Sequence, residues 1–194
     1  FEGTLQDGQI IAQPLGSAGG IKRIQEFGAT EFFDDTFWVV CGDAIIDFDL
    51  HRVRWEHDRS NSKASIVVAK VPREKVVLYG VVVCDEDDRL IEFQVQPSRE
   101  EANATLVNTC VAVFEPEIID VIPKAEEYDI GSQLFPRLLA EGLSFHAISV
   151  PFTWIDIGQL SDYWEANQQL MRGMLKGARM PGTERLPRIW TGLN

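Results

Sequence analysis

The decisive stretch of this 194-residue chain is Thr36-Phe37-Trp38-Val39-Val40-Cys41-Gly42-Asp43. Its short aromatic and β-branched run, closed by a Gly-Asp pair, is typical of a fully buried strand. Such strands lie in parallel sheets with helices on both faces, and these sheets bind ligands beyond the carboxyl ends of their strands. Asp43 is therefore either a carboxylate at a ligand-binding rim or a turn residue that only closes the strand.

Composition and charge narrow the class of protein. Hydrophobic residues make up 45% of the chain and charged residues 25%, as in a soluble globular protein, and the formal net charge of -12 argues against nucleic acid or membrane partners. The three cysteines are odd in number and far apart, which argues against a disulfide framework or a zinc site and favours a cytoplasmic protein. Because the chain starts without Met and stops where an apolar element begins, we expect a fragment of a longer protein.

Strand-like and helix-like stretches alternate along the chain, which predicts an α/β fold with a mainly parallel, Rossmann-like sheet and helices on both faces. We expect strands at 65–71, 79–84, 90–94, 106–114 and 144–150, and helices after 20, at 49–59, 116–122, 134–139 and 161–171. The pair 79–84 and 90–94 should form a local hairpin, and Ser161 should cap the last helix. Residues 1–171 would form the core, and the Gly- and Pro-interrupted residues 172–194 a linker.

Two segments carry candidate chemistry. A Gly-rich loop, 15–20, precedes a helix, so its backbone N–H groups could hold an anion or a flat base, or it could be a tight loop without a ligand. Asp156 lies between bulky apolar residues, where a carboxylate is unfavourable unless it is paired or binds a metal; it could instead cap the next helix. Two strand-end carboxylates, Asp43 and Asp156, would suit Mg²⁺. The histidines (His51, His57 and His146) show no ligand spacing and are interpreted as surface or helix residues.

Six segments together resemble a known family. They are Leu15-Gly16-Ser17-Ala18-Gly19-Gly20, Val40-Cys41-Gly42-Asp43, Tyr79-Gly80-Val81-Val82, Asn108, Asp129-Ile130-Gly131-Ser132-Gln133-Leu134-Phe135-Pro136 and Trp154-Ile155-Asp156-Ile157-Gly158. In this order and spacing they resemble the sugar-phosphate nucleotidylyltransferases over about residues 10–171, most closely the mannose-1-phosphate guanylyltransferase-like proteins. The resemblance implies a GT-A-like nucleotidyltransferase core, incomplete at the N-terminus, and a left-handed β-helix domain after residue 194.

The resemblance also implies a reaction and a site. A nucleotidyl group would pass from a nucleoside triphosphate, GTP first, to a sugar 1-phosphate, mannose 1-phosphate first, releasing pyrophosphate. Asp43 and Asp156 would be the catalytic residues that hold Mg²⁺, Gly16 would face the nucleobase, and Gly80 and Asn108 would line the sugar pocket. We further expect a homo-oligomer.

Three departures from the family pattern leave alternatives open. The family's opening Gly-rich signature with its Arg is absent, Val95-Gln96-Pro97 stands where the family has Glu-Lys-Pro, and Cys110-Val111-Ala112 replaces Gly-Ile-Tyr. The isolated chain is therefore expected to be inactive. The parent protein would be an active enzyme, a noncatalytic regulatory or nucleotide-binding paralogue, or an interaction domain without a small ligand.

Overall fold

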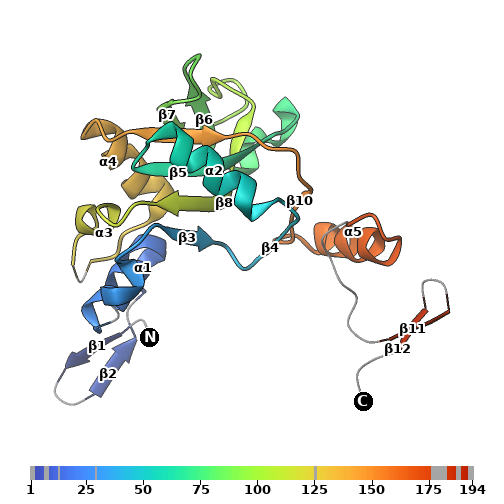
Figure 1. The fold of residues 1–194 in the computed structure, drawn as a ribbon, viewed down its shortest axis with the longest axis horizontal. Helices are drawn as coiled ribbons and strands as arrows, with labels where there is room; N and C mark the ends of the chain where they lie inside the picture. Colours follow the sequence, from blue (N-terminus) through green and yellow to red (C-terminus); the bar gives the residue numbers. More distant parts are fainter. Residues whose placement is uncertain are drawn as a thin grey trace. The chain divides into compact units, whose positions relative to one another are not determined.

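The computed structural model describes residues 3–6, 9–12, 14–28, 30–124, 126–175, 183–186 and 189–191. They divide into two compact units, one made of residues 1–40 and 54–149 and the other of residues 41–53 and 150–194 (Figure 1).

A six-stranded sheet forms the centre of the first unit. In spatial order its main path is β7 (Leu90–Gln94), β6 (Val81–Cys84), β8 (Leu106–Phe114), β5 (Ala64–Lys70) and β9 (Phe145–Ile148), and β3 (Phe37–Val40) pairs with β8 off this path. The strands expected at 65–71, 79–84, 90–94, 106–114 and 144–150 are thus confirmed to within a few residues. The first unit also holds an antiparallel hairpin, β1 (Gly3–Gln6) with β2 (Gln9–Ala12), which the sequence did not predict.

The strand directions make this a mixed sheet. β5 and β9 are parallel neighbours, whereas β3, β5 and β6 are all antiparallel to β8. Consequently β3, β5, β6 and β9 point in one direction, and β8 and β7 in the other. Four strands share one direction, as predicted for a mainly parallel sheet. However, β8 lies among them in the opposite direction, so most neighbouring pairs are antiparallel. Alternation of strands and helices in a sequence does not reveal where such a reversed strand is inserted.

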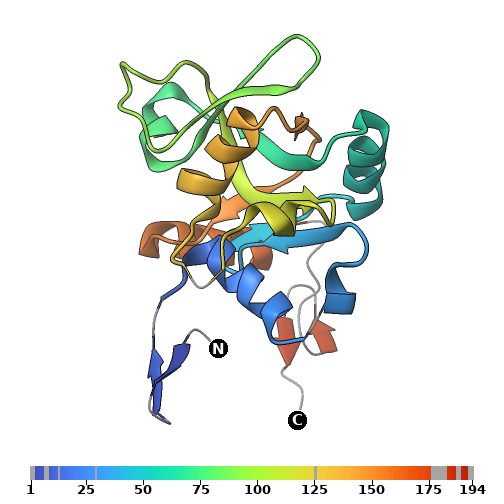
Figure 2. The ribbon, with the colours of Figure 1, turned by 90° about the vertical axis from the view of Figure 1, so that its left-hand side faces the viewer.

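Helices cover both faces of this sheet. His57 of α2 (Leu50–Ser60) is hydrogen-bonded to Ser65 of β5, whereas the next residue, Ile66, belongs to the core cluster that includes Phe135 of α4 (Phe135–Ala140). Successive strand residues point to opposite faces, so α2 and α4 lie on opposite faces, as Figure 2 shows. The remaining helical elements of this unit are α1 (Gly16–Glu26), the 3₁₀ turns η1 (Thr30–Phe33) and η2 (Arg73–Leu78), α3 (Ile118–Val121) and the π-helix η3 (Ile130–Leu134).

A chain of aromatic rings forms the core on the α4 face. The ring of Phe135 lies 5.0 Å from Phe93, 6.5 Å from Phe114 and 4.9 Å from Phe145, measured between centroids. Phe114 in turn contacts Phe37 at 5.7 Å. The mostly edge-to-face contacts add about 0.5–1.5 kcal/mol per pair beyond area burial, so this face ties β3, β7, β8 and β9 to α4.

The second unit contains a short sheet and a helix. β4 (Ala44–Ile46) pairs antiparallel with β10 (Trp154–Asp156), and α5 (Leu160–Met171) follows. Gln159, not Ser161, precedes the first helical residue, so the predicted Ser161 cap is wrong.

Within the predicted linker 172–194, β11 (Thr183–Leu186) and β12 (Ile189–Thr191) form a hairpin, while 176–182, 187–188 and 192–194 lie outside the described residues. The β-helix domain stays a prediction.

Two expectations about the decisive segments are corrected. β3 ends at Val40, and its side chains pass from buried at Phe37 to 53% exposed at Val40, so it is not fully buried. Asp43 therefore lies in the turn between β3 and β4 rather than on the end of a strand. The Gly-rich segment is not a loop before a helix, because α1 begins at Gly16 and includes Gly19 and Gly20.

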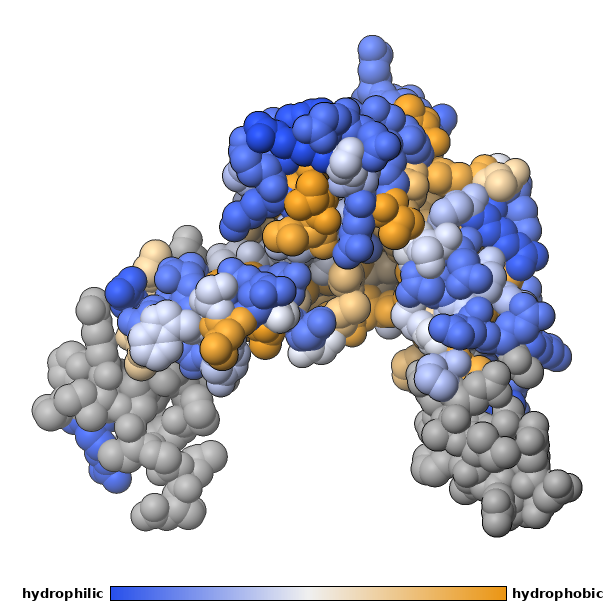
Figure 3. All heavy atoms as spheres, turned by 180° about the vertical axis from the view of Figure 1, so that it is seen from behind, coloured by the Kyte–Doolittle hydropathy of each residue, from blue (hydrophilic) through white to orange (hydrophobic). Residues whose placement is uncertain are grey.

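Among the described residues, no helix combines the length and the apolar character needed to cross a membrane. On the face drawn in Figure 3, hydrophilic side chains cover most of the described surface, with hydrophobic ones in smaller groups between them.

Truncation of a core residue should destabilise the first unit far more than the same truncation at its surface. Leu138 of α4 is fully buried, so Leu138→Ala should lower the free energy of unfolding by about 2–5 kcal/mol through lost burial and a residual cavity. Leu78→Ala, at a residue that is 54% exposed, is the matched control and should change it by less than about 0.5 kcal/mol. Urea unfolding measures both, and equal losses would contradict this description of the core.

Candidate functional site

The two predicted metal carboxylates lie on neighbouring segments of the second unit. In the β4–β10 pairing, Asp156 is opposite Ala44, and one step further the Ile157 N–H donates to the Asp43 carbonyl at 3.0 Å. Residues 113 positions apart in the sequence (156 minus 43) are thereby held side by side by backbone hydrogen bonds. The pairing continues at the other end, where Thr153 and Asp47 exchange two hydrogen bonds.

The side chain of Asp156 does not cap α5. Its Oδ1 accepts a hydrogen bond from the Gly158 N–H at 2.9 Å, which closes a turn two residues before the helix begins at Leu160. The other oxygen, Oδ2, has no partner among the described residues. The Asp43 side chain is exposed. Both carboxylates can therefore present oxygen to a ligand.

The donor set fits a magnesium ion that also has a phosphate ligand. No group of three or more His, Cys, Asp or Glu side chains suited to holding a metal occurs among the described residues. Mg²⁺, however, is usually held by one or two carboxylates together with substrate phosphates and water. Asp43 and Asp156 supply that number of carboxylates, so they suit an ion that arrives with a phosphorylated substrate rather than a permanently bound one.

The glycines of α1 serve a close approach between two main-chain segments of the first unit. The Tyr128 carbonyl accepts hydrogen bonds from the N–H groups of Ala18 and Gly19, both at 2.9 Å. A Cβ atom at Gly16 (φ +69°) would lie 2.7 Å from the Tyr128 oxygen, and one at Gly19 would lie 2.6 Å from the Glu126 oxygen. Two of the N–H groups that the sequence offers to a ligand, those of Ala18 and Gly19, are thus already hydrogen-bonded within the protein.

Asp129 connects the same segment to η3 through its side chain. Its Oδ2 accepts from the Ser17 hydroxyl at 2.7 Å, and its Oδ1 accepts from the N–H and hydroxyl of Ser132 at 2.8 and 2.9 Å. Burial alone would raise the pKa of the Asp129 carboxyl, but the hydrogen bonds from Ser132 and Ser17 outweigh it and lower that pKa. The contact between Asp129 and Ser132 was not predicted, although its signal is in the sequence: an Asp three residues before a Ser has the spacing of a helix N-cap.

Gly80 and Asn108 lie side by side in the first unit. The Asn108 N–H donates to the Gly80 carbonyl at 2.9 Å. Gly80 has no room for a side chain, because its Cβ would lie 2.4 Å from the edge of the Phe93 ring. The Asn108 side chain is directed to its own strand, where Oδ1 accepts from the Cys110 N–H at 3.0 Å. The structure therefore brings these two predicted residues together, with Phe93 as a neighbour that the sequence analysis did not name.

Cys110 forms a bulge in β8. Ile66 is paired with Ala112 and Val68 with Asn108, so three residues of β8 stand opposite Val67. The Thr109 hydroxyl donates to the Val67 carbonyl at 2.8 Å, and Cys110 has φ +60°, in the left-handed region that favours glycine. The family glycine noted at this position is therefore the residue that the backbone would prefer.

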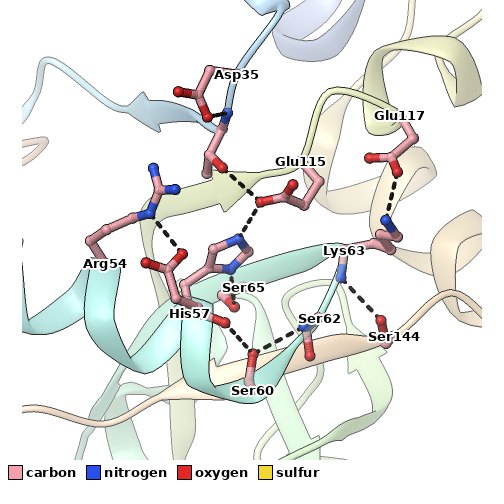
Figure 4. Close-up of polar contacts among 12 residues, drawn as sticks. Asp35, Arg54, His57, Ser60, Ser62, Lys63, Ser65, Glu115, Glu117 and Ser144 are labelled. Carbon is pink, nitrogen blue, oxygen red and sulfur yellow. Dashed lines mark hydrogen bonds and ion pairs between the residues drawn. The ribbon is translucent and has the colours of Figure 1, made fainter.

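A polar cluster that the sequence analysis missed surrounds His57 (Figure 4). The Glu115 Oε1 accepts from the Thr36 hydroxyl at 2.7 Å and contacts the His57 Nε2 at 3.0 Å, while the His57 Nδ1 contacts the Ser65 hydroxyl at 2.7 Å. His57 is 2% exposed, so it is not a surface residue. The carboxylate–imidazole–hydroxyl order matches that of hydrolases, but Ser65 is fully buried and no substrate can reach it. The cluster is structural.

The predicted site residues thus fall into two groups. Gly16, Gly80 and Asn108 belong to the first unit, and Asp43 and Asp156 belong to the second.

The lowered pKa of Asp129 predicts a pH-dependent contribution to stability. Its ionised form is favoured by folding, so the contribution is complete above the ordinary carboxyl value of about 3.9 and is lost as pH falls through the lower folded value. Asp129→Asn should reduce the free energy of unfolding by about 1 kcal/mol at pH 7 and by less at about pH 3, below the ordinary carboxyl value. Urea unfolding at both values tests this, with Glu86→Gln in an exposed turn as a control that should follow the unaltered protein.

The backbone of Cys110 predicts a stabilising substitution. Cys110→Gly should raise the free energy of unfolding by about 1 kcal/mol, because glycine adopts φ +60° without the Cβ clash. Cys84→Gly, in the regular strand β6, should lower it by a similar amount. In urea unfolding the two variants should change the free energy of unfolding in opposite directions. A decrease in both variants would contradict backbone strain at Cys110.

Comparisons with known proteins come from sequence and from structure. A family model described as nucleotidyl transferase matches residues 6–173. A UTP--glucose-1-phosphate uridylyltransferase of Synechocystis sp. is 46% identical over 194 residues, covering 100% of this chain and 50% of that protein. A mannose-1-phosphate guanylyltransferase of Mycobacterium tuberculosis is 27% identical over 192 residues, covering 94% and 51%. The chain therefore spans about half the length of these curated relatives.

Solved structures agree on the fold. A crystal structure of a putative glucose-1-phosphate thymidylyltransferase from Bacillus anthracis, in complex with a sucrose, matches with a TM-score of 0.66 at 18% identity. The match covers 82% of this chain and 63% of that one. At this identity the likeness confirms the α/β core with its mixed, Rossmann-like sheet.

Proposed function

The chain belongs to the nucleotidyl transferase family, and from this premise we propose that the protein containing it transfers a nucleotidyl group from a nucleoside triphosphate to a sugar 1-phosphate. We propose UTP and glucose 1-phosphate as the substrates. The supporting observation is the 46% identity with a UTP--glucose-1-phosphate uridylyltransferase over the whole chain. GTP and mannose 1-phosphate, expected from the motifs, are the second candidate pair, supported by a relative at 27% identity.

In the proposed reaction an oxygen of the sugar 1-phosphate attacks the α-phosphorus of the triphosphate, and pyrophosphate leaves. Such a transfer depends on alignment and on neutralising the charge of the transferring group. Bound Mg²⁺ would supply that neutralisation at the α-phosphate. The chain itself would contribute two carboxylates, Asp43 and Asp156. They lie on paired segments, so they could hold the ion without a prior rearrangement of the backbone.

We assign the remaining predicted residues to binding. Gly16 would face the nucleobase, and its segment is held firmly by the Tyr128 carbonyl. Gly80 and Asn108 would line the sugar pocket, and their shared hydrogen bond supports placing them in one pocket. Val95 and Gln96 bring no charge to a phosphate; Val95 is 53% exposed and Gln96 has φ +40°. This departure from the family pattern supports the alternative of a noncatalytic paralogue.

Pyrophosphate release by the complete gene product tests the proposal. With Mg²⁺, UTP and glucose 1-phosphate should give the highest kcat/KM, followed by GTP and mannose 1-phosphate. No release with any pair of triphosphate and sugar 1-phosphate, despite nucleotide binding, would establish the noncatalytic alternative.

Removing either carboxylate should abolish most of the activity. Asp43→Asn and Asp156→Asn should each lower kcat by about 100-fold or more, because each removes a charge proposed to hold Mg²⁺. Asp49→Asn is the matched control. Asp49 accepts from the His51 N–H at 2.9 Å at the start of α2, a cap that asparagine can also supply, so kcat should change less than about twofold. Equal effects of all three variants would overturn the assignment of the metal carboxylates.

A further inference from the structure

The N-terminal turn of α1 and the segment 128–132 are joined by two kinds of contact. Main-chain hydrogen bonds run from Ala18 and Gly19 to the Tyr128 carbonyl, and from the Tyr128 N–H to the Leu15 carbonyl at 2.8 Å. The side chain of Ser17 adds a second connection, because its hydroxyl donates to Asp129 at 2.7 Å and accepts from the Ile130 N–H at 2.8 Å. The position of this turn is thus set by the second segment.

The carboxylate of Asp129 is the centre of this connection. One oxygen accepts from the N–H and hydroxyl of Ser132 and the other accepts from the Ser17 hydroxyl, so all three hydrogen atoms point toward the carboxylate. Asparagine keeps one acceptor oxygen, which can face Ser132, but its NH₂ group can only donate, so the Ser17 hydroxyl would have to turn and accept. An isosteric change at Asp129 therefore replaces the charge-assisted hydrogen bond from α1 by a weaker neutral one without leaving a cavity.

The segment held by Asp129 also reaches the neighbourhood of Gly80. Gly131, in η3, faces the Phe93 ring, with a Cβ position 3.6 Å from it, and Gly80 faces the same ring. The π-helix itself is a rare conformation that is frequent at functional sites. η3 therefore lies against both regions assigned to substrate, through Ser17 on one side and through Phe93 on the other.

We propose that Asp129 is a positioning residue for the nucleotide, acting through Ser17 to fix the turn that contains Gly16. The inference rests on the proposed function, in which this turn faces the nucleobase. Asp129 does not itself contact the reacting atoms. Its loss should weaken binding of the triphosphate while the carboxylates of the second unit still support the chemical step.

Steady-state kinetics of the complete gene product distinguishes this role from general structural damage. Asp129→Asn and Ser17→Ala should each raise KM for the triphosphate about tenfold, with changes in kcat and in KM for the sugar 1-phosphate below about threefold, as expected when one charge-assisted hydrogen bond is lost. The double variant should have a triphosphate KM no higher than that of the more impaired single variant, because both substitutions remove the same hydrogen bond. Ser17→Thr keeps the hydroxyl and should restore the triphosphate KM.

Glu117→Gln is the matched control. It also replaces a hydrogen-bonded carboxylate by an amide, removing the ion pair with Lys63, and should leave both KM values unchanged. Hydrogen exchange gives a readout that needs no activity: the amides of Ala18 and Gly19 should exchange about tenfold faster in Asp129→Asn and Ser17→Ala than in Glu117→Gln.

The outcomes separate the two proposals. Suppose that the unaltered protein is active. If Asp129→Asn then leaves KM for the triphosphate unchanged, or lowers kcat and raises both KM values to a similar extent, the positioning role is wrong and the proposed function stands. Unchanged exchange at Ala18 and Gly19 also overturns the positioning role. If the unaltered protein releases no pyrophosphate with any substrate pair, the proposed function fails and the inference fails with it.

Discussion

The backbone pairing of β8 is the interaction on which the first unit depends. One edge of this nine-residue strand pairs with β5, while the other pairs with β6 near its start and with β3 at its end. β9 joins the sheet by pairing with β5, and β7 by pairing with β6. A buried backbone group without a partner costs about 1–3 kcal/mol, so a strand shared by three neighbours must remain almost regular. Its one departure, the bulge at Cys110, occurs beside Asn108.

The sequence predicted elements well where burial is periodic or continuous. The bounds of β8 agree with the predicted strand because apolar residues stand on both sides of Asn108 and Thr109 and mark the whole segment as a strand. The start of α1 was missed because glycine is a poor helix former, and the contact with Tyr128 that overrides this preference lies over 100 residues away. Val40 was expected to be buried because its sequence is strand-like, and only the structure gives its exposure.

The site was predictable to the extent that it depends on local sequence. Asp43 and Asp156 were predicted together because each is a carboxylate next to an apolar strand, and the structure pairs their segments through β4 and β10, while their role in binding a metal stays a prediction. Ser17 and Asp129 were missed as a pair because a hydroxyl and a carboxylate 112 residues apart carry no joint pattern. His57 lies on a helix, as predicted, but its burial was missed because a histidine on a helix gives no sign of Ser65 and Glu115 as partners.

The shared hydrogen bonds of Glu115 have a consequence for chain entropy. Thr36 and His57 meet at the same carboxylate oxygen, so the 21-residue interval between them (57 minus 36), which contains Asp43, is a loop closed at its base. The entropy of closing a flexible loop grows as about (3/2)RT ln n with its length n. Once the first unit has folded, the entropy of closing this loop has already been lost. The segment that contains Asp43 then has fewer conformations to lose when it becomes ordered.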